Sequence, residues 1–131
     1  MKNLIQYTFV FLLTIGANCA MAHGGEDHGD AKPKVSITNK NYFTTSGVSD
    51  VYELLLRYEP IKSNEDTHLK LFVSDFDSNK PVDSATIEIT SPDDDKLKFE
   101  VHQLEKGVYE IHTTFPENKI YSLTIDIKSA P

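Results

Sequence analysis

The chain has 131 residues, 25% of them charged and 39% hydrophobic, and its formal net charge at pH 7 is −7. A chain of this length forms one domain with a modest core. Its acidity argues against partners that carry many phosphate groups, so we expect neither nucleic-acid binding nor attachment to an anionic lipid surface. The composition leaves open the binding of cations or of other proteins.

The first 22 residues, "MKNLIQYTFVFLLTIGANCAMA", are typical of a secretory signal. Lys2 precedes an apolar run over 7–17, and Ala20-Met21-Ala22 has the A-x-A form that signal peptidase accepts. The run is too short to cross a bilayer as a helix. We therefore expect cleavage after Ala22 and a periplasmic protein of 109 residues, net charge −8, with no membrane span. Lipidation at Cys19 is disfavoured, because Asn18 stands where a small residue is wanted.

Residues 23–34, "HGGEDHGDAKPK", are predicted to form a disordered leader, since glycines and a proline interrupt every pattern. Cleavage would give His23 a free α-amine beside its imidazole, and the two nitrogens can chelate an ion. The predicted metal site comprises His23, Glu26, Asp27 and His28. Nitrogen and oxygen ligands suit Zn(II), Cu(II), Ni(II) or Co(II), bound weakly because a flexible leader must be ordered. The alternative is a solvated tail with incidental histidines.

From residue 35 onward, apolar and polar residues alternate with a period of two, which predicts strands separated by turn residues. The predicted strands are 35–38, 52–58, 68–76, 85–90, 97–104, 108–115 and 121–127. Six to seven short strands without a helical period predict an all-β fold, an antiparallel immunoglobulin-like or fibronectin-III-like sandwich over 35–131. Its predicted core contains Leu54, Leu56, Leu71, Ile87, Ile89, Val101, Tyr109, Ile111, Leu123 and Ile125.

Gly107-Val108-Tyr109 favours a tyrosine corner, where the chain crosses from one sheet to the other. A simple hairpin with an ordinary core tyrosine is the alternative. If the corner is present, His102 and His112 lie on opposite sheets and cannot share an ion. We therefore interpret them, together with His68, as separate surface histidines.

Catalytic motifs are absent from the sequence. The expected mature chain has no cysteine, no Gly-x-Ser-x-Gly, no His-Glu-x-x-His and no phosphate-binding glycine loop, which predicts a non-enzymatic protein. An EF-hand over Asp75 to Thr86 is rejected, because Lys80 replaces the required glycine and Thr86 the bidentate glutamate. With neither Met nor Cys after residue 22, the mature chain offers no preferred ligand to Cu(I).

Two stretches that follow the histidine-rich start, "YELLLRYEPIKSNEDTHLKLFVSDFDSNKPVDSATIEI" and "GVYEIHTTFPENKIYSLTIDI", carry a family resemblance. They resemble the N-terminal region of periplasmic adaptor subunits, or membrane fusion proteins, of heavy-metal efflux pumps of the resistance-nodulation-division class. The matching residues are Glu53, Leu54, Tyr58, Pro60, Ile61, His68, Leu69, Leu71, Phe72, Val73, Asp75, Phe76, Lys80, Pro81 and Val82.

The chain departs from these adaptors because no helical hairpin, lipoyl-like domain or β-barrel follows the sandwich. It resembles either a stand-alone relative of the N-terminal domain or a truncated adaptor. The resemblance implies a module associated with divalent heavy-metal efflux, in which the leader collects metal and the sandwich docks to pump components or other envelope proteins. Two alternatives are a periplasmic protein-interaction domain with no metal role and a small copper-resistance carrier.

Overall fold

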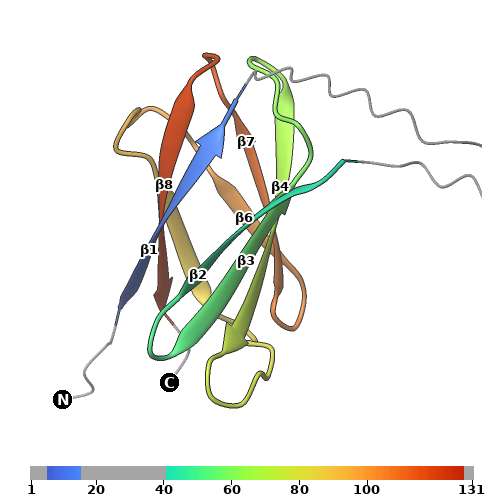
Figure 1. The fold of residues 1–131 in the computed structure, drawn as a ribbon, viewed down its shortest axis with the longest axis vertical. Helices are drawn as coiled ribbons and strands as arrows, with labels where there is room; N and C mark the ends of the chain where they lie inside the picture. Colours follow the sequence, from blue (N-terminus) through green and yellow to red (C-terminus); the bar gives the residue numbers. More distant parts are fainter. Residues whose placement is uncertain (1–5, 16–40, 129–131) are drawn as a thin grey trace, which may run out of the picture.

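A computed structural model describes residues 6–15 and 41–128, and in these ranges the chain forms strands and connections but no helix (Figure 1). The eight strands are β1 (Tyr7–Thr14), β2 (Phe43–Val48), β3 (Tyr52–Tyr58), β4 (Asp66–Asp75), β5 (Thr86–Thr90), β6 (Glu100–Glu105), β7 (Val108–Thr114) and β8 (Ile120–Lys128). They form two antiparallel sheets, one with the order β1-β8-β5 and one with the order β2-β3-β4-β7-β6. The predicted all-β sandwich is confirmed.

The core lies between the two sheets and follows the alternation in the sequence. In β3, β7 and β8, every second side chain is buried. Eight of the ten predicted core residues are buried. The other two, Ile87 and Val101, are half-buried and pack against the core, because β5 and β6 are edge strands.

Strand β1 comes from the segment that the sequence assigns to the signal. It pairs with β8 from Tyr7↔Ile127 to Thr14↔Ile120 and buries Phe9, Phe11 and Leu13 in the core. In the full-length chain these residues therefore form an edge strand. The predicted leader and the predicted strand over 35–38 lie outside the described residues.

Strand β2 was not predicted. Its sequence, "FTTSGV", shows no alternation of apolar and polar residues, and four of its six residues are exposed while the other two are only half-buried. It forms because it pairs with β3 along six residues, from Phe43↔Tyr58 to Val48↔Glu53. Tertiary pairing has here overridden a weak local signal.

The predicted tyrosine corner is wrong, because β6 and β7 are neighbours in one sheet and a tight turn at Gly107 joins them. The chain instead crosses between sheets in other connections, among them the one from β4 to β5. The Tyr109 hydroxyl tethers that connection: it donates a hydrogen bond to the Val82 carbonyl at 2.9 Å and accepts one from the Ala85 N–H at 3.1 Å.

Candidate metal centre

A short pattern recurs on three adjacent strands of the five-stranded sheet. An acidic residue stands two positions before a histidine in Asp66-x-His68, Glu100-x-His102 and Glu110-x-His112. Because side chains two apart on a strand point to the same side, each carboxylate lies beside its own imidazole. The carboxylate–imidazole distances are 3.0 Å in β4, 3.9 Å in β6 and 3.1 Å in β7. We call these six residues the acid–histidine face.

Strand register brings the three pairs together on the outer surface of the sheet. His68 is the direct partner of His112 between β4 and β7, and Glu100 is the partner of His112 between β7 and β6. The His68 and His112 ring centroids are 4.0 Å apart, and those of His102 and His112 are 5.7 Å apart. The expectation that His102 and His112 lie on opposite sheets is therefore wrong, because it depended on the tyrosine corner.

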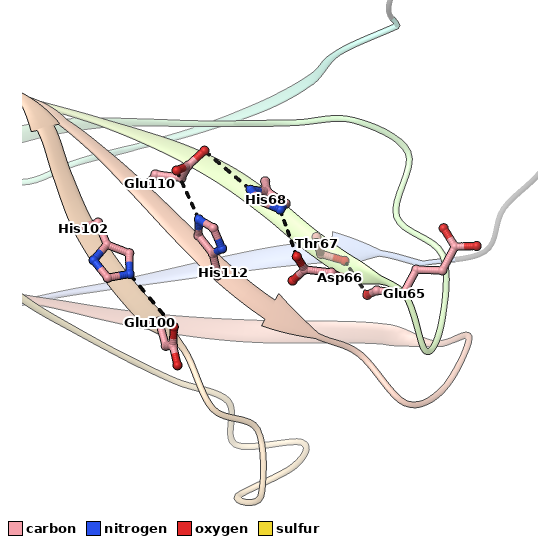
Figure 2. A network of polar contacts seen from close by, with 8 residues as sticks. All are labelled: Glu65, Asp66, Thr67, His68, Glu100, His102, Glu110 and His112. Carbon is pink, nitrogen blue, oxygen red and sulfur yellow. Dashed lines mark hydrogen bonds and ion pairs between the residues drawn. The ribbon is translucent and has the colours of Figure 1, made fainter.

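Glu110 orients two of the three imidazoles. Its carboxylate lies 3.1 Å from His112 Nε2 and 3.5 Å from His68 Nδ1 (Figure 2). The hydrogen bond with His112 is the main cause that holds the pKa of Glu110 below its ordinary value, and the one with His68 acts in the same direction. An ionised Glu110 thus orients both rings. It does not contact Nδ1 of His112 or Nε2 of His68.

Asp66, His68 and His112 can hold a metal ion. One ligand atom from each residue lies within 4.8 Å of the other two. Ligands of a tetrahedral zinc ion are about 3.3 Å apart, because each bond is about 2.0–2.1 Å long. The His68 Nε2 to Asp66 Oδ2 distance is 3.0 Å, and small rotations of the side chains would bring the three ligand atoms to such spacings. We call these three residues the Asp66–His68–His112 cluster.

The arrangement matches a common design of metal sites, in which a carboxylate binds the second nitrogen of a ligating imidazole. With Glu110 at His68 Nδ1, the Nε2 atom faces Asp66 and is available to an ion. Three protein ligands leave at least one coordination position open to water or to another donor. Nitrogen and oxygen donors without sulfur favour Zn(II), Cu(II), Ni(II) and Co(II) over Cu(I).

The cluster is open to solvent. The side chains of Asp66 and His68 are 67% and 50% exposed, while those of His112 and Glu110 are 30% and 27% exposed. Shallow depressions of about 740 Å³ and 700 Å³ flank it, and Asp66 lines both. An ion can therefore enter and leave without any rearrangement of the sheet.

The residues predicted as the metal site, His23, Glu26, Asp27 and His28, lie outside the described residues. The Asp66–His68–His112 cluster was not predicted, because the expected tyrosine corner placed His102 and His112 on opposite sheets and His68 was interpreted as a separate surface histidine. The available signal was the threefold acid-x-His pattern on outward-facing positions. Its convergence, however, depends on the pairing of β4 with β7, which are not consecutive in the chain.

No family model matches this sequence, and no curated protein or solved structure matches it either. Within the described part of the chain, no helix is long and apolar enough to cross a lipid bilayer.

Proposed function

We propose that this protein is an exported, non-enzymatic immunoglobulin-like module that binds a divalent transition-metal ion and works beside a heavy-metal efflux system. The observation that carries the metal role is the Asp66–His68–His112 cluster, whose ligand atoms lie within 4.8 Å of one another. Export is supported by the signal-like start of the sequence. The association with efflux is supported by the resemblance to periplasmic adaptor subunits.

The exposed, three-ligand site suits an ion that is held for a short time and passed on. A site that retains its ion permanently is usually closed by four protein ligands, whereas this one leaves a position free for a ligand from a partner. We expect binding at micromolar scale, which corresponds to a free energy of about −8 kcal/mol. Affinity should fall on acidification, because protons compete with the ion for the imidazoles.

Isothermal titration calorimetry with Zn(II), Ni(II) and Cu(II) tests the metal role on the chain that begins at His23. The double variant His68→Ala with His112→Ala should bind at least tenfold more weakly, which is about 1.4 kcal/mol. Its matched control is His102→Ala, which removes a histidine of the same face that is not one of the three ligands and should leave affinity within about twofold. Glu110→Gln, which weakens the orientation of both rings, should lose about tenfold.

A second double variant, His23→Ala with His28→Ala, shows whether the leader or the sheet binds the metal. If this variant loses the binding and the sheet variant does not, the leader is the site. If both variants bind as the parent does, the interaction domain without a metal role becomes the better explanation. In the source cell, loss of the gene should lower tolerance to the same ions, and the parent gene but not the His68→Ala, His112→Ala gene should restore it.

A further inference from the structure

Strand β1 at the edge of the three-stranded sheet belongs to the folded core, yet it lies in the segment that signal cleavage would remove. Strand β1 covers one side of β8 along its whole paired length, and Ile15, just beyond β1, adds a further buried side chain. Cleavage after Ala22, which this inference takes from the sequence, would remove both. The processed chain would then have a bare β8 edge and an apolar slot in its core.

In the full-length chain β1 fills this slot, and the side chains that line it are fully buried. The β8 side chains that face it (Tyr121, Leu123, Ile125 and Ile127) are all 0% exposed. On the opposite sheet, β2 packs against β1, and the Phe9 and Phe11 rings lie 3.0 Å and 3.2 Å from where a Cβ atom on Gly47 would be. An open sheet edge next to exposed apolar side chains pairs readily with any available strand.

We propose that in the processed chain residues 35–38, "VSIT", take the place of β1 beside β8. Their apolar β-branched residues, Val35 and Ile37, alternate with Ser36 and Thr38, as inward and outward residues alternate in β1. Charge gives no obstacle, because no acidic residue occurs from Ala31 to Tyr42.

The direction of the chain favours residues 35–38 as the strand that takes the place of β1. β1 runs antiparallel to β8 and finishes at the end of the sandwich where β2 begins (Figure 1). A strand in the same slot and the same direction would therefore finish at the end of the sandwich where β2 begins (Figure 1). Only residues 39–42, "NKNY", would connect the two, and four residues span about 13 Å when extended. Packed sheets are about 10 Å apart, so a connection of this length can reach from one sheet to the other.

The slot also sets the register. If the substitute strand ends level with β1, Thr38 takes the position of Thr14 opposite Ile120. Ile37 then faces Tyr121, Ser36 pairs with Ser122, and Val35 faces Leu123. Ile37 would then fill the position of Leu13, Val35 would fill that of Phe11 only in part, and the position of Phe9 would stay empty.

Cysteine cross-linking tests the register directly, because the chain that begins at His23 has no cysteine of its own. Ser36→Cys with Ser122→Cys should form an intramolecular disulfide in high yield, since partners in adjacent strands have Cα atoms about 4.5–5.5 Å apart. The matched control is Ser36→Cys with Thr90→Cys. Thr90 lies on β5, beyond β8 and about two strand spacings, or 9–10 Å, from the slot, so this pair should not cross-link.

Charge substitution gives a second readout that needs no cross-link. Val35→Asp with Ile37→Asp should lower the melting temperature of the processed chain by more than about 5 °C, whereas Ser36→Asp with Thr38→Asp, on the outward face, should change it by less than about 2 °C. Equal effects of the two variants, or a Ser36–Ser122 yield no higher than the control, would overturn the proposal.

Three further results would also overturn it. A mass that retains Met1 in the exported protein would show that β1 is never removed. Dimerisation of the processed chain, with cross-links between copies, would make a second copy the occupant. Fast hydrogen exchange at the β8 amides that face β1, in a monomer, would show that the edge stays open for another protein.

Discussion

The two most informative hydroxyl groups in this sandwich belong to Tyr109 and Tyr121, and they predict opposite outcomes for the same substitution. Tyr109 is 2% exposed, and its hydroxyl both donates to the Val82 carbonyl and accepts from the Ala85 N–H. Tyr121 is 0% exposed, and its hydroxyl has no hydrogen-bond partner among the described residues. Phenylalanine keeps either ring and removes only the hydroxyl, so packing stays nearly constant.

Tyr109→Phe removes two hydrogen bonds, each with a net worth of about 0.5–1.5 kcal/mol, and it leaves two backbone groups without a partner. We expect the free energy of unfolding to fall by about 1–3 kcal/mol. At roughly 4–8 °C per kcal/mol for a domain of this size, the melting temperature should fall by at least about 4 °C. The connection from β4 to β5 should then exchange its amide hydrogens faster, because its tether is gone.

Tyr121→Phe should leave stability unchanged or raise it by up to about 1 kcal/mol, because burial of an unpaired hydroxyl is unfavourable. The ring contact with Phe115, at 5.0 Å between centroids, is kept. Urea denaturation of the full-length chain, followed by circular dichroism, measures both changes. If the two variants differ by less than about 0.5 kcal/mol, a value below one ordinary hydrogen bond, the assignment of hydrogen-bonding roles to these hydroxyls is refuted.

Three further substitutions test the core, a turn and a carboxylate, each by urea denaturation. Ile111→Ala should lower the free energy of unfolding by about 2–5 kcal/mol, because Ile111 is 0% exposed; a loss under about 1 kcal/mol would contradict its burial. Gly107→Ala should lower the free energy of unfolding by about 1–3 kcal/mol or more, because φ is +73° and a Cβ atom would lie 2.5 Å from the Pro81 Cβ. A neutral result would contradict this turn geometry. The Ser78 hydroxyl and N–H hold the pKa of Asp75 below its ordinary value, so this contribution is complete above about pH 4 and disappears as the pH falls through the lowered pKa. The stability difference between the parent and Asp75→Asn should accordingly shrink below about pH 4, and a difference that is constant with pH would contradict it.

Much of the fold could be predicted because burial follows a period of two in strands such as β3 and β8. Strand β2 could not be predicted, because it forms through its pairing with β3 and its own composition gives no strand signal. β1 illustrates a different limit. The stretch "YTFVFLLT" is apolar enough to serve as a signal and alternates well enough to form an edge strand, so its sequence fits both roles.

The candidate site shows a similar division. Each acid-x-His pair could be predicted locally, because residues two apart on a strand share a face. The meeting of His68 with His112 could not, because it depends on which strands pair and in which register. Metal sites built across strands are therefore harder to find in a single sequence than sites built within one segment.

The pairing of β1 with β8 also has a consequence for synthesis on the ribosome. Tyr7 pairs with Ile127, 120 positions later in the chain. At about 5–20 residues per second, roughly 6–24 s pass between the synthesis of the two residues. During that interval β1 has no partner strand, so the leading segment is accessible without any unfolding of the sandwich. Once β8 has been synthesised, the sandwich is completed and Phe9, Phe11 and Leu13 are buried, so if the segment does act as a signal, export would have to begin before β8 pairs with β1.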